Sequence, residues 1–508
     1  MAKLKPECLK AAVAADSLKC SEIGRDILQK GGSAVDGAIA ALLCTSIINP
    51  QSAGIGGGVI FTVMDSYGKV KIINSRETVP TTTSPDLLQT CPKDYSWKED
   101  SRWIGVPGEI RGYAVAHRLY GKLPWAELFQ PTIKLAREGF PIPYVQGQYI
   151  PRIANTSLWK FFSDKNGNLL KTGDTVKFEK LADTLETIAN EGADVFYNGT
   201  IAKNLISDIQ KAGGTLTLED LASYKANVTD AWNISLGDYK MYFPPPPAGG
   251  AILSLILNIM KGYKMNSEPK MTNEKTLFYH RYTEALKFAN GLKKQFKQMT
   301  EKFTEDSFAN HIRSLITNKT HELQYYSITP YLESMGTTHV SVLAEDGSAV
   351  SATSSINHMF GSKVFSPSTG VILNNQVYDF CHKMDSISPG ERPPSNMAPS
   401  MLKSKSKTLV IGGSGGSMIT PGVASAIMNH LWFGKSLKEA IDSPIVYVNS
   451  KGEVKFESKT KKDVVDALEA KGHQILKFYN VVNSVEKESD GCISAWSDER
   501  KKGKAAGY

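Results

Sequence analysis

The sequence predicts an α+β protein, and two contrasting patterns carry this prediction. Before residue 336, apolar residues recur mainly at helical spacing. The segments expected to be helical are 10–30, 33–48, 109–120, 124–139, 178–191, 202–212, 217–224, 249–262 and 273–297. After residue 336, short strand-like runs alternate with glycine turns. We therefore expect a mostly helical part followed by a mostly stranded part.

Two shorter segments qualify this outline. A glycine-rich run at 54–58 stands directly before an expected strand at 59–64. A phosphate-binding loop would instead precede a helix and show a GxGxxG or Walker pattern, and neither is found there. Four prolines at 244–247 predict a rigid linker before the helix at 249–262.

The most informative stretch begins at Gly336. Alternating residues from Thr337 onwards predict a strand, Glu-Asp-Gly at 345–347 predicts a turn, and 348–353 predicts the returning strand. Thr337 would then open a β-hairpin, with the threonine and its neighbours at the start of the first strand.

A threonine in this position suggests a nucleophile. Its hydroxyl is weakly nucleophilic and needs a base, which the α-amine of Thr337 could supply after cleavage of the preceding bond, with a pKa of about 8. Gly336 has no side chain to keep the Thr337 hydroxyl away from the preceding carbonyl. The plain alternative is an edge strand that carries surface threonines.

Composition excludes some classes of function. The 508 residues are 41% apolar, enough for a sizeable core, and 59 basic against 51 acidic residues give a charge of +8. The basic residues are scattered, whereas a nucleic-acid binder concentrates them in a patch. The longest apolar runs, 37–48 and 248–260, are shorter than the roughly 20 residues that span a bilayer. The opening residues do not form a signal peptide, and a soluble protein is expected.

Long motifs across the chain resemble the γ-glutamyltransferases, which cleave themselves and use an N-terminal threonine as nucleophile. The matching runs are NPQSAGIGGGVIF (49–61), INSRETVP (73–80), GVPGEIRGY (105–113), LFQPTIKLAREGFP (128–141), GTLTLEDLASY (214–224), GTTHVSVLAEDGSAVSAT (336–353), INHMFGSKVFSPSTGVILNNQVYDF (356–380) and IGGSGGSMIT (411–420). The resemblance extends from about residue 11 to residue 508.

This resemblance implies a fold, a maturation step and a reaction. The fold is the four-layer αββα sandwich of the N-terminal-nucleophile hydrolases. Self-cleavage between Gly336 and Thr337 would leave a large subunit, 1–336, and a small subunit, 337–508, which share the central sheets. Mature Thr337 would take up a γ-glutamyl group and pass it to water or an amino-acid acceptor. The resemblance implies neither a metal nor an organic cofactor.

The same resemblance assigns the donor site. Arg76 matches the arginine that pairs with the substrate α-carboxylate, a bidentate role suited to guanidinium. The remaining matches are Ser395 and Asn396 for the carboxylate, with Asn396 in place of the usual second serine; Asn357, Gln376 and Asp379 for the α-ammonium; and Gly415 and Gly416 for the oxyanion hole.

Hydroxyl residues beside the nucleophile also match the family. Thr353 and Ser355 are expected to hydrogen-bond the hydroxyl and amine of Thr337, with Ser355 where threonine is usual. Thr353 lies on the returning strand of the hairpin and could stand beside Thr337. His339 is a tempting base, but we expect it to be structural.

Finer features resemble a vertebrate subtype that cleaves leukotriene C4. The matching runs are 103–109, 244–254, 448–457 and 480–485. The expected small-molecule partners are therefore glutathione, its conjugates and leukotriene C4. Animal members of the family are usually tethered by an N-terminal membrane helix, which implies a type II protein on the outer face of the plasma membrane, with an anchor that is not in this chain.

Six cysteines show no CxxC spacing for a metal. The positions of Cys20 and Cys44 match a disulfide of animal family members. Free buried thiols are the default expectation for Cys381 and Cys492, and the pairing of Cys8 and Cys91 stays open. Five sequons, all before Thr337, are possible glycosylation sites: Asn155, Asn198, Asn227, Asn233 and Asn318.

Two other functions compete with this interpretation. GGSGG at 412–416 fits GxSxG after a strand at 408–411 and is followed by Asp442 and His473, the order of an α/β-hydrolase triad with Ser414 as nucleophile. Alternatively, the chain is a surface binding protein that keeps the fold but does not cleave itself.

Overall fold

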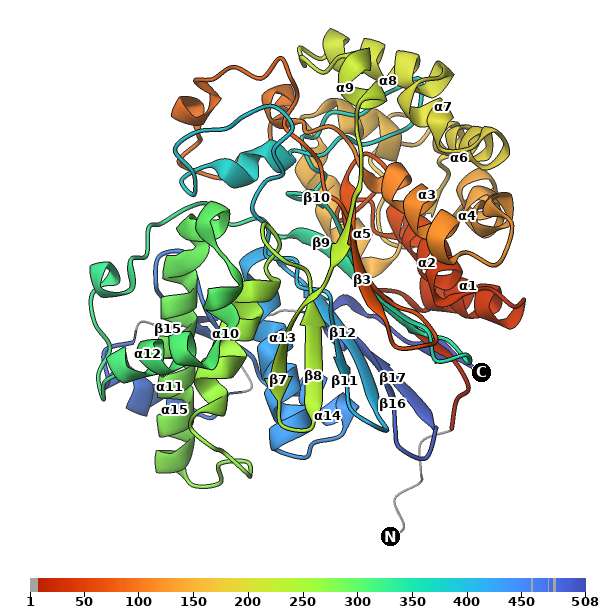
Figure 1. The fold of residues 1–508 in the computed structure, drawn as a ribbon. Helices are drawn as coiled ribbons and strands as arrows, with labels where there is room; N and C mark the ends of the chain where they lie inside the picture. The colour runs from red at the N-terminus through yellow and green to blue at the C-terminus, as the bar shows by residue number, and fades with distance from the viewer. Residues whose placement is uncertain (1–7, 458–459, 474, 478–480) are drawn as a thin grey trace.

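A computed structural model describes residues 8–457, 460–473, 475–477 and 481–508. Figure 1 shows two stacked β-sheets between two layers of helices, so the expected αββα sandwich is confirmed. The helices are α1 Leu18–Gln29, α2 Ala34–Ile48, α3 Glu109–Tyr120, α4 Trp125–Glu138, α5 Tyr144–Tyr149, α6 Glu179–Glu191, α7 Asp194–Tyr197, α8 Thr200–Lys211, α9 Leu218–Ala222, α10 Gly250–Lys261, α11 Thr272–Gly291, α12 Asp306–Leu315, α13 Ile419–Ile427, α14 Leu437–Asp442 and α15 Lys462–Glu469.

The first large sheet has the strand order β18-β1-β9-β10-β2-β3-β6 and the second β17-β16-β12-β11-β8-β7. Neighbouring strands in both sheets are antiparallel. The first comprises β1 Ala12–Ala14, β2 Gly58–Met64, β3 Val70–Ser75, β6 Asn227–Asp230, β9 Gly336–Leu343, β10 Ala349–Asn357 and β18 Ala506–Gly507. The second comprises β7 Trp232–Leu236, β8 Tyr239–Phe243, β11 Ser400–Lys403, β12 Thr408–Ser414, β16 Val481–Lys487 and β17 Ile493–Ser497. Smaller strands are β4 Phe140–Pro141, β5 Thr175–Val176, β13 Val446–Val448, β14 Val454–Phe456 and β15 Ile475–Lys477.

Three apolar layers hold the sandwich together. Residues of α1, α2 and α4 pack with Val340 and Val342 on the outer face of the first sheet. Residues of α10, α11 and α13 cover the second sheet. Between the sheets, Leu343 of β9 packs with Met401 and Val410 of the second sheet. Side chains alternate along β9, so those on one face pack against the helices and those on the other face pack against the second sheet. The start of this strand therefore lies between these two layers.

Both sheets combine strands from either side of the Gly336–Thr337 bond. In the first sheet, β9 and β10 pair with β1 and β2, and in the second, β11 pairs with β8. A cut at that bond would therefore leave two fragments that share both sheets and are not separate domains. The expected hairpin is confirmed: β9 and β10 are antiparallel neighbours joined at 344–348.

Helices occur in all nine segments where helical spacing predicted them, but two boundaries were wrong. Residues 12–14 form β1 rather than the start of a helix, because this segment pairs between β9 and β18. Backbone pairing in the sheet outweighs the helical preference of alanine there. The helix expected over 273–297 ends at Gly291 and continues as a 3₁₀ turn, Leu292–Gln298.

The expectation of free thiols at Cys381 and Cys492 was wrong. All six cysteines are paired, as Cys8–Cys492, Cys20–Cys44 and Cys91–Cys381. The expected Cys20–Cys44 bridge joins α1 to α2. The other two partners are 484 and 290 residues apart, so only the tertiary fold brings them together.

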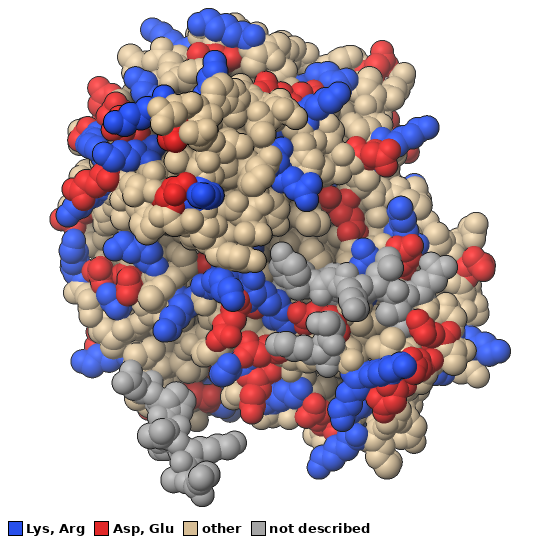
Figure 2. All heavy atoms as spheres, turned by 180° about the vertical axis from the view of Figure 1, so that it is seen from behind, with Lys and Arg blue, Asp and Glu red and all other residues tan. Residues whose placement is uncertain are grey.

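The surface agrees with the sequence. Lys and Arg side chains are interspersed with Asp and Glu over the face shown in Figure 2, as expected for a solvated surface. All five sequon asparagines are exposed. Among the described residues, no helix is both long and apolar enough to cross a bilayer. The opening residues 1–6, which did not resemble a signal peptide, lie outside the described part.

Candidate active site

Thr337 lies near the start of β9, where the chain is buried. Its hydroxyl donates a hydrogen bond to the Gly336 carbonyl oxygen at 2.7 Å and lies 3.4 Å from Ser355 Oγ. Ser355 Oγ itself donates a short hydrogen bond to the Gly336 carbonyl. Two hydroxyls thus converge on the carbonyl of the bond expected to be cut.

A β-bulge creates this arrangement. The ladder pairs Ser354 with Thr338 but then shifts, so that Asn357 pairs with Gly336. Asn357 adopts a positive φ of 78°, and its backbone N–H donates to Ser355 Oγ at 2.8 Å. A Cβ at Gly336 would lie 2.5 Å from the Asn357 carbonyl oxygen, so only glycine fits at this position.

The register corrects one expectation about the neighbours of Thr337. Thr353 pairs with His339 rather than lying beside Thr337, and its hydroxyl is 2.8 Å from His339 Nδ1. His339 is buried between the sheets, where a Cβ at Gly412 would collide with its ring. Burial lowers the pKa of His339 to about 3 and keeps it neutral. Ser355 is therefore the hydroxyl next to Thr337.

Arg76 approaches the same place from the end of β3. Its side chain is 2% exposed, and Nη2 lies 3.3 Å from Asp379 Oδ2. Gln376 Nε2 donates to the same carboxylate oxygen at 2.6 Å, and the Lys383 ammonium lies 4.0 Å from Oδ1. Gln376 and Asp379 belong to one 3₁₀ turn, Gln376–Phe380.

The carboxylate-binding candidates Ser395 and Asn396 are positioned by the proline-rich linker. The Ser395 N–H donates to the Pro247 carbonyl at 2.8 Å, and the Gly249 N–H donates to the Met397 carbonyl at 2.7 Å. The linker leads directly into α10, as the sequence predicted. It therefore fixes the backbone on both sides of Asn396.

One small cavity brings the expected residues together. Its lining comprises Arg76, Ser334, Thr337, Ser355, Asn357, Gln376, Asp379, Ser395, Asn396, Met397, Gly416 and Ile419. Within the described structure, Arg76 Nε, Asn357 Oδ1 and Gln376 Oε1 are buried without a hydrogen-bond partner. The Arg76 guanidinium thus remains available to a carboxylate, and the two amide oxygens remain available to an ammonium group. A site that binds an amino acid needs partners for both of these charges.

Gly415 and Gly416 follow β12 and both adopt positive φ, 112° and 61°. In the intact chain the Ser334 carbonyl oxygen occupies the place where a Cβ at Gly416 would stand, at 1.6 Å. The segment before Gly336 therefore covers the expected oxyanion hole. Gly415 is adjacent to the cavity lining but is not part of it.

Sequence patterns did not point to Lys501, which contacts the backbone of the nucleophile. Its ammonium donates to the Thr337 carbonyl at 2.7 Å, to Asp16 at 3.0 Å and to Ser414 Oγ at 3.0 Å. Asp16 also accepts from Thr338 Oγ1 at 2.6 Å. An ion pair between the partly buried Lys501 and the buried Asp16 thus holds the first two residues of the expected small subunit.

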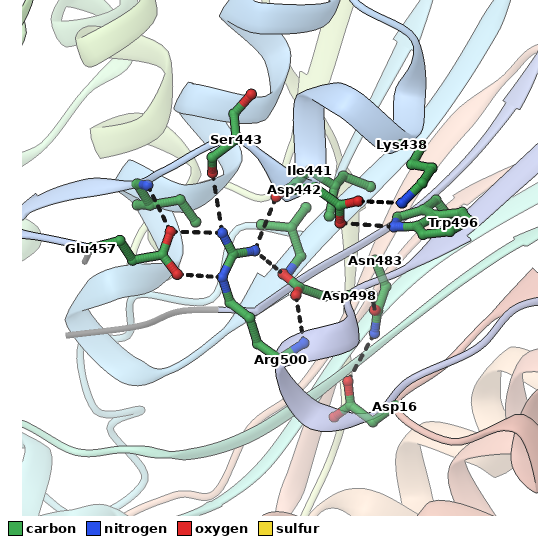
Figure 3. A network of polar contacts seen from close by, with 12 residues as sticks. Asp16, Lys438, Ile441, Asp442, Ser443, Glu457, Asn483, Trp496, Asp498 and Arg500 are labelled. Atoms are coloured by element: carbon green, nitrogen blue, oxygen red, sulfur yellow. Dashed lines mark hydrogen bonds and ion pairs between the residues drawn. The ribbon is translucent and has the colours of Figure 1, made fainter. Parts of the chain in front are cut away.

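Arg500 anchors the segment that carries Lys501. Figure 3 shows its guanidinium between Glu457 and Asp498, at 2.6 and 2.9 Å, and bonded to two backbone carbonyls. Asp498 accepts from the Val482 N–H of β16 at 2.8 Å. This network ties the C-terminal segment to the second sheet and so positions Lys501.

Two buried carboxyl groups lie behind the site. Burial raises the pKa of Glu77 to about 7 and that of Glu109 to about 8. Glu109 accepts hydrogen bonds from Tyr113 Oη and Ser354 Oγ, so it supports β10 next to Ser355. Both groups hold protons in the folded state at pH values where an exposed glutamate is ionised.

The α/β-hydrolase alternative is contradicted by the geometry. Ser414 ends a strand of an antiparallel sheet and contacts Lys501. Asp442 instead binds Lys438 and Trp496 (Figure 3), and His473 contacts His280 and Lys287. The described contacts therefore do not assemble a Ser-His-Asp triad.

His280, Glu284 and His473 form a group whose ligand atoms lie within 4.8 Å of one another. The Lys287 ammonium lies 3.3 Å from His473 Nδ1 and 3.9 Å from Glu284 Oε1. The Lys287 ammonium already supplies a positive charge beside the Glu284 carboxylate, so we do not assign a metal to the group.

A threonine at the start of a central strand in an αββα sandwich is the architecture of the N-terminal-nucleophile hydrolases, and this chain is one of them. A family model described as Gamma-glutamyltranspeptidase matches residues 20–508. Glutathione hydrolase 5 proenzyme of Rattus norvegicus is 46% identical over 542 aligned residues, covering 100% of this chain and 94% of the relative. The chain belongs to the γ-glutamyltranspeptidase family.

Solved structures agree with this assignment. The crystal structure of cephalosporin acylase from Bacillus halodurans has a TM-score of 0.87 at 25% identity and covers 100% of this chain and 98% of its own. Gamma-glutamyltranspeptidase from Pseudomonas nitroreducens complexed with L-DON has a TM-score of 0.55 at 27% identity and covers 62% of this chain and 96% of its own.

Proposed function

We propose that this enzyme cleaves the γ-glutamyl amide bond of glutathione and its conjugates and passes the γ-glutamyl group to water or an amino-acid acceptor. The observation that carries the proposal is the single cavity in which Thr337, Arg76 and Asp379 meet. A γ-glutamyl donor has an α-carboxylate, an α-ammonium and a scissile carbonyl, and the cavity offers one group for each.

Maturation precedes this reaction. The Thr337 hydroxyl attacks the Gly336 carbonyl carbon, and its proton passes to the departing amide nitrogen. The C–N bond breaks and an ester forms. Water then hydrolyses the ester, which leaves a carboxylate on Gly336 and a free α-amine on Thr337. The Ser355 hydroxyl already donates to the Gly336 oxygen that becomes negative during the attack.

Catalysis then reuses the same threonine. The Thr337 α-amine takes the hydroxyl proton as Oγ1 attacks the donor carbonyl, and the leaving amine accepts a proton as the acyl-enzyme forms. Arg76 holds the α-carboxylate, and Asp379 with the amides of Asn357 and Gln376 holds the α-ammonium. The N–H groups of Gly415 and Gly416 face the developing oxyanion once the Ser334 carbonyl has moved away.

Leukotriene C4 is the finer substrate proposal. It is a glutathione conjugate, so it presents the same γ-glutamyl group, and its support is the subtype-like sequence runs together with the 46% identity to glutathione hydrolase 5. A measurement of kcat/KM for leukotriene C4 and glutathione under one condition tests it. A value for leukotriene C4 far below that for glutathione would contradict the proposal.

We also propose an oxidising compartment, in line with an enzyme that faces the cell exterior. Its support is the three disulfides, which are rare in proteins of reducing compartments. Alkylation of the protein from its native source, without prior reduction, should leave all six cysteines unlabelled.

The decisive experiment is intact mass and N-terminal sequencing of wild type, Thr337→Ala and Thr337→Ser. We expect wild type to give fragments 1–336 and 337–508, and Thr337→Ala to stay uncut and inactive. Thr337→Ser keeps a hydroxyl and should still cut. Cleavage or γ-glutamyl transfer by Thr337→Ala would contradict the proposed nucleophile, and an uncut wild type would favour the non-processing alternative.

A further inference from the structure

Two of the three disulfides cross the proposed cut. Cys20–Cys44 joins residues 24 apart within the large fragment. Cys8–Cys492 and Cys91–Cys381 each join a cysteine before Gly336 to one after Thr337. A cut at the Gly336–Thr337 bond alone would therefore not separate the fragments.

The Cys8–Cys492 bridge ties together the two ends of the chain. Beside it, Leu9 and Ile493 exchange backbone hydrogen bonds at 3.3 and 3.1 Å, and the Lys10 N–H donates to the Tyr508 carbonyl at 2.5 Å. These pairings add the first described residues to strands of the small fragment. These contacts involve neither Thr337 nor a residue that lines the cavity, so we do not expect this bridge to affect the donor site directly.

The Cys91–Cys381 bridge lies next to the donor site. Cys381 directly follows the 3₁₀ turn Gln376–Phe380, which carries Gln376 and Asp379. Cys91 directly follows another 3₁₀ turn, Leu87–Thr90. This bridge therefore fixes the end of the segment on which the expected ammonium-binding groups stand.

The surroundings of Cys91–Cys381 show what else holds this segment. Phe380 and Tyr378 pack with Leu87 and Trp103 in one small apolar cluster, and the Tyr378 and Trp103 rings meet edge to face at 5.2 Å. The cluster combines residues from both sides of the proposed cut. Once the chain is cut, this disulfide would be the covalent link beside the packing and the polar contacts, such as Arg76 with Asp379, that keep the large-fragment side of the cluster against the turn.

We infer that the mature enzyme is one covalent molecule, in which Cys8–Cys492 and Cys91–Cys381 join the two fragments, and that Cys91–Cys381 also positions the Gln376–Asp379 turn for donor binding. This inference rests on the cleavage in the proposed function. The cleavage consumes one water and breaks one C–N bond, so both sulfur pairs pass through it unchanged and no oxidant is needed at that step.

Covalent linkage has a consequence for stability. Two fragments held only by packing would separate on unfolding, and their reassembly would depend on protein concentration. Linked fragments keep a fixed effective concentration of each other, of the order of millimolar for short tethers. The unfolding midpoint of the oxidised, cut enzyme should therefore not change with protein concentration.

Intact mass under denaturing conditions tests the linkage. Without reductant, the cut wild type should have the mass of the full chain plus one water. After reduction by dithiothreitol, which is oxidised to its cyclic disulfide, fragments 1–336 and 337–508 should separate. Two separate fragments before reduction would overturn the inference.

A non-reduced digest separates failure of the linkage from failure of the proposed cleavage. If wild type proves uncut, the proposed cleavage fails, and the digest still reports on the bridges. Linked peptides that contain Cys8 with Cys492 and Cys91 with Cys381 support the pairing. Free thiols or other pairs at these positions overturn it.

Paired serine variants assign a role to each bridge. Removing all four crossing cysteines should release the fragments without reductant, whereas the matched control Cys20→Ser/Cys44→Ser should leave them joined. If the fourfold variant fails to fold, the wild-type mass and digest decide the linkage alone.

Kinetics test the positioning role. In Cys91→Ser/Cys381→Ser, we expect KM for a γ-glutamyl donor to rise about tenfold while kcat stays within about twofold, because the displaced turn weakens binding before it affects the nucleophile. Cys8→Ser/Cys492→Ser should leave both constants within about twofold. An unchanged KM in the first variant, or an equal rise in both, would overturn the positioning role.

Discussion

Arg76→Gln is the sharpest test of the donor site, because the Arg76 guanidinium can still form hydrogen bonds with a ligand. It is 2% exposed, its Nε has no hydrogen-bond partner within the described structure, and its contact with Asp379 is a single one at 3.3 Å. A substrate carboxylate would add charge-assisted hydrogen bonds, each contributing about 1.5–3 kcal/mol. Two such bonds at the lower end give about 3 kcal/mol, or about a hundredfold in kcat/KM.

The assay compares two donors that differ only at the α-carbon. One is γ-glutamyl-p-nitroanilide, and the other is the 4-aminobutyryl anilide, which lacks the α-carboxylate. Arg76→Gln should lower kcat/KM for the first by about a hundredfold, and for the second by much less, since no carboxylate is then lost. Arg392→Gln is the matched control, because Arg392 contacts Lys225 and Tyr224 outside the cavity.

An equal loss with both donors would refute the reasoning. It would mean that Arg76 acts through Asp379 or the fold and does not bind the carboxylate. Urea unfolding of each variant separates this outcome from simple loss of stability.

Three further predictions follow from the same geometry. Gly336→Ala should abolish self-cleavage, seen as an uncut chain by intact mass, because the new Cβ would lie 2.5 Å from the Asn357 carbonyl oxygen; efficient cleavage would contradict the bulge geometry. Lys501→Met should lower the free energy of unfolding by about 3 kcal/mol in urea, because it leaves the Asp16 carboxylate buried without its cation; a loss below about 1 kcal/mol would show that Asp16 is satisfied by its other partners. Burial raises the pKa of Glu77 to about 7, so the folded state keeps a proton that the unfolded chain releases near pH 4.3. The stability that this proton confers is complete below about pH 4.3 and is lost as the pH rises towards 7. Glu77→Gln should therefore flatten the decline in unfolding free energy between pH 5 and 8. An unchanged slope would contradict this role of Glu77.

Local patterns determined much of this protein. Alternation around Thr337 was enough to predict the β9–β10 hairpin and its turn, because neighbouring residues decide strand periodicity and turn chemistry. Helical spacing located nine helices for the same reason. Family motifs brought in Arg76, Asp379 and Ser395, and the structure places all three around one cavity, although their roles stay predictions.

Contacts between distant residues were beyond these patterns. Six cysteines allow 15 pairings, and the sequence had no means of selecting Cys91–Cys381 across 290 residues. The bulge that sets Ser355 rather than Thr353 beside Thr337 is a property of a strand pair, which one strand alone does not specify.

The sequence by itself determined where a nucleophile could arise, because a glycine-threonine step at the start of a strand is a local feature. Only the tertiary structure decided what surrounds that nucleophile. Arg76 meets Asp379 across 303 positions, and Lys501 reaches the Thr337 carbonyl from near the end of the chain. Burial then sets how these groups behave, since the charge of a side chain depends on the solvent and partners that packing leaves it.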